Sequence, residues 1–130
     1  MGFAYYIILD NKEPEFDTLV GGWFIANDIH KLSSICRRHK IKLLEDFITM
    51  SPDDIYDMLG DDVDLPEEYR EKWFTADEGI SLVTTLINHI RENPKDVKNA
   101  DGVLKDLTDF LNLFEKARGI GAKWHFNVDI

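Results

Sequence analysis

The two ends of the chain carry its clearest strand patterns, and these patterns limit the folds open to it. Residues 124–130 alternate strictly between apolar and polar side chains, as expected of a strand with one buried face and one solvent-facing face. Residues 3–9 form a continuous run of aromatic, β-branched and other apolar side chains that ends in turn residues, which is typical of a strand covered on both faces. We therefore predict a small sheet that pairs the N-terminal strand with the C-terminal strand.

The strongest helical signals lie just before the C-terminal strand. A Thr-Ala-Asp-Glu capping box at 75–78 is followed by apolar residues at helical spacing until an Asn-Pro pair ends the pattern. Asn99 or Asp101 opens a second helical pattern, whose apolar stripe ends at a pair of glycines. These patterns predict two long helices, at 76–92 and 100–118, that form an antiparallel hairpin over one face of the sheet.

Weaker patterns lie nearer the N-terminus. Asn27 or Asp28 can cap a helix whose apolar stripe includes Cys36. A cysteine in such a stripe behaves as a small hydrophobic residue, so we expect it in the core. Residues 19–25 are a candidate third strand, in which a Gly-Gly pair would form a turn or a bulge.

Two short helices complete the expected set. A Ser-Pro-Asp-Asp start predicts one helix at 51–59, which a glycine ends, and a further short helix is expected at 66–73. The predicted architecture is α+β, with the small sheet packed against four to five helices. The length of 130 residues and the 44% apolar content fit a single globular domain spanning 1–130.

The cysteine count and the N-terminus bear on where the protein works. A chain with one cysteine forms no internal disulfide, which favours a reduced, cytoplasmic protein. The apolar run at 3–9 follows no positively charged region and precedes no cleavage site, so it does not fit a signal peptide. It is also too short to span a bilayer. We expect no attachment to a membrane.

The negative charge of the chain is concentrated in residues 45–78. This stretch holds 13 of the 25 carboxylates and two basic residues, a net charge of 2 − 13 = −11, whereas the remainder carries 13 − 12 = +1. Such a concentration can steer a basic partner toward the protein. The net charge of −10 argues against nucleic acid, since phosphate binding requires a basic surface.

The leading hypothesis is therefore a protein-interaction module that binds a partner with a basic surface. Aromatic side chains within or beside the acidic stretch would act as apolar anchors. The predicted partner-binding residues are Asp53, Asp54, Asp57, Asp61, Asp62, Asp64, Glu67, Glu68, Tyr56, Tyr69 and Trp73.

A basic segment at 31–42 could compensate the acidic stretch from within. It contains five lysines and arginines, which can pair inside one molecule or head to tail in a homo-oligomer. This small, acidic character is also similar to that of antitoxin-like and immunity-like inhibitors, which occupy the basic cleft of a toxic enzyme. That resemblance rests on composition and involves no motif.

A metal-dependent enzyme is the first alternative. The polar face of the C-terminal strand carries His125, Asn127 and Asp129, and a histidine beside an aspartate can act as a general base or a metal ligand. Carboxylates of the acidic stretch would complete such a site. The acidic spacing fails the pattern of an EF-hand calcium loop, and no histidine pair has the spacing of a helical zinc site. We therefore predict no metal and no cofactor.

A ligand-sensing domain with an aromatic pocket is the second alternative. Two aromatic pairs stand out, Trp23-Phe24 and Trp73-Phe74. Neighbouring residues of a regular element point in different directions, so we expect one member of each pair to be buried and the other to approach the surface.

Overall fold

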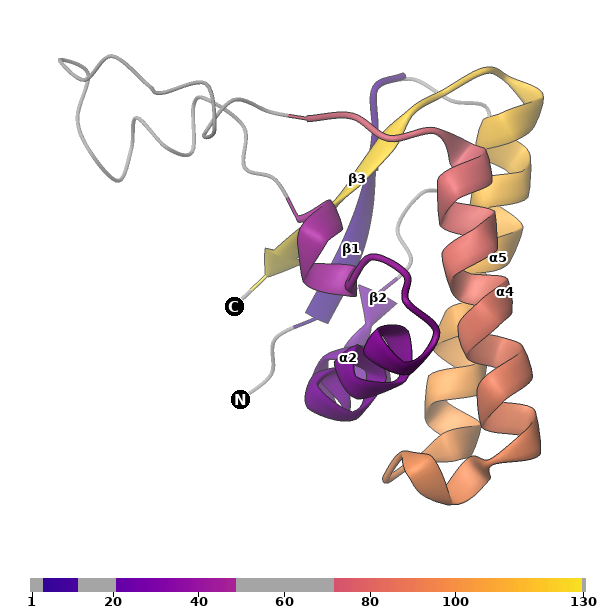
Figure 1. The fold of residues 1–130 in the computed structure, drawn as a ribbon. Helices are drawn as coiled ribbons and strands as arrows, with labels where there is room; N and C mark the ends of the chain where they lie inside the picture. The colour runs from indigo at the N-terminus through magenta and orange to yellow at the C-terminus, as the bar shows by residue number, and fades with distance from the viewer. Residues whose placement is uncertain (1–3, 12–20, 49–71, 130) are drawn as a thin grey trace, which may run out of the picture.

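A computed structural model describes residues 4–11, 21–48 and 72–129 of the chain. Its described strands are β1 (Ala4–Leu9), β2 (Gly21–Gly22) and β3 (Trp124–Asp129). They form an antiparallel sheet in the order β2-β1-β3 (Figure 1). The register places Ile7 opposite Phe126. The predicted pairing of the N-terminal and C-terminal strands is therefore confirmed.

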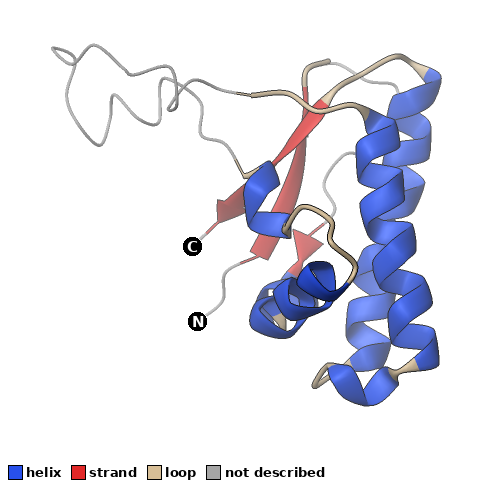
Figure 2. Ribbon diagram, viewed as in Figure 1, coloured by secondary structure: helices blue, strands red, loops and turns tan. Residues whose placement is uncertain are grey.

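The described helices pack mainly on one side of this sheet (Figure 2). They comprise the α-helices α1 (Trp23–Asn27), α2 (Ile29–Arg38), α4 (Ala76–Glu92) and α5 (Ala100–Gly119), and the short 3-10 helices η1 (Leu44–Phe47) and η3 (Pro94–Asp96). The α+β architecture is confirmed, and so is the long antiparallel hairpin formed by α4 and α5. The short helix expected at 51–59, and the one at 66–73 apart from its last two residues, lie outside the described residues; residues 72–73 are not helical.

The predicted helix starts are made by local side-chain caps. The Thr75 hydroxyl accepts a hydrogen bond from the Glu78 amide at 3.2 Å, and the Asn99 side-chain oxygen accepts one from the Gly102 amide at 2.9 Å. Each bond satisfies one amide that the first helical turn leaves unpaired. Because both caps are encoded within four consecutive residues, the sequence predicted both helix starts closely.

Aromatic side chains between the sheet and the hairpin form the centre of the core. Trp124 and Phe126 of β3 are fully buried and pack against Phe114 and Phe110 of α5, with ring centroids 4.5 and 5.6 Å apart. The crossing of the two long helices is close at Gly79, where an added Cβ would lie 2.8 Å from the Phe114 ring. Cys36 is buried in this core, as predicted.

The third strand was predicted over too long a range. Gly21 and Gly22 are extended, but residues 23–25 begin helix α1, and residues 19–20 lie outside the described part. The amides of Phe24 and Ile25 donate to the carboxylate of Asp106 at 2.8 and 3.2 Å. This carboxylate, supplied by α5, satisfies the first amides of α1 and so supports a helix where the local pattern indicated a strand.

The prediction for the two aromatic pairs was also wrong. Trp23 and Phe24 are 47% and 38% exposed, and Trp73 and Phe74 are both half-buried. The reason for the first pair is that α1 is a short helix at the surface, whose buried face is formed by Ile25 and Ala26.

Candidate functional site

Two residues of the acidic stretch pair with the edge of β3 that faces away from β1. Ile48 forms a parallel bridge with Phe126, and Phe74 forms an antiparallel bridge with Trp124. The second bridge has two backbone hydrogen bonds of 2.8 and 2.9 Å. The residues on either side of 49–71 therefore pair with Phe126 and Trp124, two positions apart on one strand.

Most of the predicted partner-binding residues belong to the segment between these two bridges. They lie outside the described residues: Asp53, Asp54, Asp57, Asp61, Asp62, Asp64, Glu67, Glu68, Tyr56 and Tyr69. The segment at 49–71 holds nine acidic residues and Arg70, a net charge of 1 − 9 = −8. The structure thus defines the attachment of the acidic segment, and the sequence defines its charge.

Trp73 is the described member of the predicted anchor set, and it lies on the outer face of the sheet. Its ring packs on the imidazole of His125, with centroids 4.7 Å apart and planes tilted by 54°. His125 is 2% exposed, so the expected solvent-facing position of this residue was wrong. The physical reason is that the chain returning to the edge of β3 places an indole over the imidazole.

The alternative polar site is only partly assembled on this face. The His125 Nδ1–H donates to the backbone oxygen of Phe126 at 3.0 Å, which uses one ring nitrogen in a structural bond. Asn127 is half-buried and lies opposite Tyr6, and Asp129 is placed by its backbone opposite Ala4. Within residues 4–11, 21–48 and 72–129, no group of three histidine, cysteine or acidic side chains is arranged to hold a metal ion.

A chain of side-chain contacts joins the ends of α2 and α4, and no local sequence pattern predicted it. His39 Nε2 lies 3.0 Å from His89 Nδ1, and His89 Nε2 lies 2.7 Å from Asp96 Oδ2. Arg38 contacts the same carboxylate oxygen at 3.3 Å. The hydrogen bond from His89, together with the charge of Arg38, holds the pKa of Asp96 below its usual value.

The direction of the hydrogen bonds in this cluster follows from the carboxylate. Asp96 accepts from the Nε2–H of His89, so a neutral His89 has an unprotonated Nδ1. His39 then donates its Nε2–H to that nitrogen. None of the members of this cluster lines the pocket that is described next.

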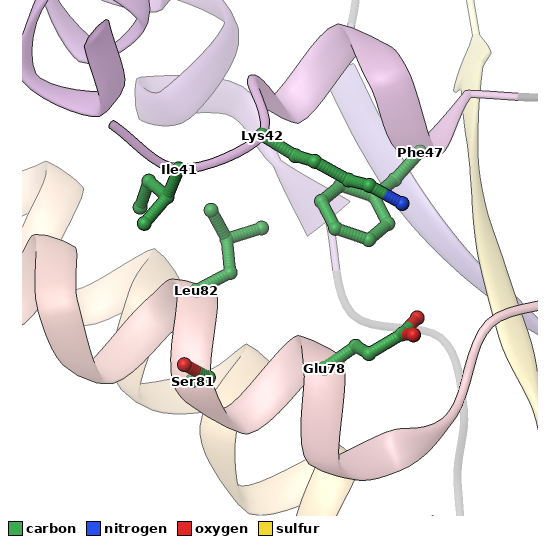
Figure 3. A pocket seen from close by; sticks show the side chains of 6 residues that line it. All are labelled: Ile41, Lys42, Phe47, Glu78, Ser81 and Leu82. Atoms are coloured by element: carbon green, nitrogen blue, oxygen red, sulfur yellow. The ribbon is translucent and has the colours of Figure 1, made fainter. Parts of the chain in front are cut away.

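An apolar pocket of about 270 Å³ lies between residues 41–47 and the start of α4 (Figure 3). It is lined by Ile41, Lys42, Phe47, Glu78, Ser81 and Leu82. The Lys42 Nζ lies 5.3 Å from the ring centroid of Phe74 and 5.7 Å from that of Phe47, within the range of cation–π attraction. Phe47 is stacked in turn on Trp124, at 5.1 Å between centroids.

The alternative of an aromatic pocket was based on the pairs Trp23-Phe24 and Trp73-Phe74, none of which lines this pocket. Lys42, in the loop between α2 and η1, and Glu78, in α4, are 36 positions apart, so no spacing rule connects them. Glu78 was identified as part of a helix cap, and Lys42 as part of the basic segment. The one sequence sign of this pocket was Phe47, an aromatic residue between Lys42 and Glu78 in the chain. Its position in the structure, however, is set by η1.

Comparison with known proteins adds no identification. No protein-family model, no curated protein and no solved structure matches this chain. A search of the described residues finds no helix with both the length and the apolar character needed to cross a membrane. The functional argument therefore depends on the charges and geometry of the chain itself.

Proposed function

We propose that this protein is a small interaction module whose acidic segment, at 53–68, binds a basic surface on a protein partner. The observation that carries the proposal is that Ile48 and Phe74, which lie on either side of this segment in the sequence, both pair with one edge of β3. The residues between them, 49–71, carry a net charge of −8.

The position of the basic side chains supports an external partner. Arg38 of the basic segment pairs with Asp96, and Lys42 lies over two phenylalanine rings. The Arg38 charge is therefore paired with a carboxylate outside residues 49–71. A partner with its own basic surface would relieve the repulsion among the carboxylates and would be attracted over long distances.

Trp73 supports the same proposal from the re-entry side of the segment. It is half-buried against His125, so part of its indole is exposed, and it follows the acidic residues closely in the sequence. Aromatic side chains next to charged rims are frequent centres of binding energy in protein interfaces. An inhibitor of the immunity type, acting in the cytoplasm on a basic enzyme cleft, is the form of this function that we favour.

The buried position of His125 gives the metal-dependent enzyme little support. A general base has to come within hydrogen-bond reach of its substrate. The His125 ring is instead covered by Trp73 and bonded to the backbone. Asp129 lies four positions further along the same strand.

Affinity capture from a lysate of the native source tests the interaction proposal. Two triple variants remove three charges each from the segment, namely Asp53→Asn/Asp54→Asn/Asp57→Asn and Asp61→Asn/Asp62→Asn/Asp64→Asn. A matched control removes three charges from exposed positions on the helices: Glu92→Gln/Asp101→Asn/Glu115→Gln. We expect the wild type and the control to capture the same basic protein, and both segment variants to lose it.

The salt dependence of capture separates charge steering from apolar adhesion. Raising the ionic strength shortens the Debye length to about 8 Å at 0.15 M, so capture by the wild type should weaken steeply. Equal capture by the wild type, the control and both segment variants would contradict the proposal. Circular dichroism should show that all four proteins are folded.

A further inference from the structure

The pocket between residues 41–47 and α4 has one apolar end and one charged end. Figure 3 shows Ile41 and Leu82 at one end, and the Lys42 Nζ and the Glu78 carboxylate at the other. Its volume of about 270 Å³ falls below the roughly 300–1,000 Å³ typical of sites for drug-sized ligands. A ligand that fits it is therefore small, with a short apolar part.

The two charges at the pocket are not paired with each other. The ion pairs found among the described residues do not join Lys42 to Glu78. The ammonium of Lys42 is held over the rings of Phe47 and Phe74, which leaves its hydrogen-bond donors unused by those rings. The pocket thus presents one donor cation and one acceptor anion on opposite sides of the same opening.

We propose that this pocket binds a small zwitterion with an apolar side chain, of the class of aliphatic α-amino acids. The ligand carboxylate would accept hydrogen bonds from Lys42, and the ligand ammonium would donate to Glu78. The side chain would pack on Ile41 and Leu82. None of the lining residues belongs to 49–71, and the test uses a small molecule and no protein partner, so it does not depend on the proposed interaction.

The presence of both a cation and an anion at the pocket argues against a ligand that carries a single charge. A carboxylic acid would satisfy Lys42 but would face the Glu78 carboxylate, and an amine would satisfy Glu78 but would face the Lys42 ammonium. Like charges in contact are unfavourable. A zwitterion satisfies both groups, whereas glycine would leave the apolar end empty.

Titration followed by amide and methyl NMR tests the ligand class, with L-leucine as the probe. Two analogues each lack one charge, namely 4-methylpentanoate and isopentylamine, and glycine lacks the side chain. We expect L-leucine to shift the signals of the pocket residues saturably, with a dissociation constant on the order of ~1 mM. The three comparison compounds should bind at least about tenfold more weakly, a difference of ~1.4 kcal/mol.

Variants at the charged end test the geometry. Lys42→Met and Glu78→Gln should each weaken L-leucine binding about tenfold or more, whereas Lys31→Met and Glu115→Gln, at exposed positions outside the pocket, should leave it unchanged. Lys42→Arg keeps the charge and should retain binding. Because Glu78→Gln preserves side-chain size, it serves as the decisive variant if Lys42→Met does not fold.

Three results would overturn the proposal. The first is the absence of any saturable shift with L-leucine in the wild type. The second is equal affinity for 4-methylpentanoate or isopentylamine, which would show a site for a single charge. The third is unchanged L-leucine affinity in folded Glu78→Gln.

Discussion

Two junctions between helices of this fold each use a carboxylate, but in different ways. At the junction of α1 and α5, Asp106 is buried and accepts hydrogen bonds from two backbone amides. At the junction of α2 and α4, Asp96 lies nearer the surface and accepts from side chains, those of His89 and Arg38. The first junction bonds a carboxylate to the backbone, whereas the second bonds one to side chains.

Asp28 completes the first junction from the opposite side. It lies between α1 and α2, is buried, and accepts hydrogen bonds from the amides of Lys98 and Asn99, each at 3.1 Å. Thus α5 supplies a carboxylate to the start of α1, and the link between α1 and α2 supplies one to the start of α5. This reciprocal arrangement shows that the two segments order each other, although they are far apart in sequence.

Removing the Asp106 carboxylate should have the largest effect of the changes at these junctions. Asp106→Ala leaves the amides of Phe24 and Ile25 without their acceptor, and we expect the free energy of unfolding to fall by about 2–4 kcal/mol. Denaturant unfolding measures this loss. Asp109→Ala, one turn further along α5 and paired only with Lys105 among the contacts described, is the control and should cost less than about 1 kcal/mol. Equal losses would show that Asp106 has no special role.

Removing the Asp28 carboxylate should lower the free energy of unfolding by less than removing that of Asp106. Asp28→Ala removes the acceptor of the Lys98 and Asn99 amides, but both residues are exposed, so water can replace part of the lost bonding. We expect a loss of about 1–2 kcal/mol in the same unfolding experiment. A loss larger than that of Asp106→Ala would reverse the order of importance that burial predicts.

The two junctions should also respond to pH in opposite directions. Burial raises the pKa of Asp106 above its usual 3.8, and the contacts with His89 and Arg38 lower that of Asp96. A raised acid pKa contributes stability that is present below pH 3.8 and is lost as the pH rises through the folded value. A lowered pKa contributes stability that is present above pH 3.8 and is lost as the pH falls through the folded value.

Unfolding measured between about pH 2 and 7 should therefore separate two variants. Relative to the wild type, Asp96→Asn should be destabilising at neutral pH and should approach neutrality in acid. The destabilisation caused by Asp106→Asn should instead be greater in acid than at neutral pH. Parallel pH profiles for the two variants would contradict the contrast between the junctions.

The parts of the fold that the sequence predicted are those formed by residues close together in the chain. The α4–α5 hairpin and the terminal strands were predicted because helix caps, apolar stripes and strand patterns are local. The helical start of α1 was missed because its capping carboxylate, Asp106, lies 81 and 82 residues from the amides it binds. The His39–His89 contact spans 50 residues and was missed for the same reason.

For the candidate sites, sequence predicted charge better than position. The concentration of acidic residues was evident, but its attachment through Ile48 and Phe74 depends on the edge of β3. The environment of His125 was misjudged because strand alternation describes one strand and does not include Trp73. The pocket forms because the loop that carries Lys42 lies beside the start of α4, which carries Glu78. Only the folded chain brings these two parts together.

The two bridges on β3 have a consequence for the chain on either side of residues 49–71. Because these bridges are made at Phe126 and Trp124, they are separated by roughly 7 Å along the strand. The closure of this part of the chain is therefore set by two backbone pairings on one strand, and a change at Phe126 or Trp124 would act on both sides of residues 49–71 at once.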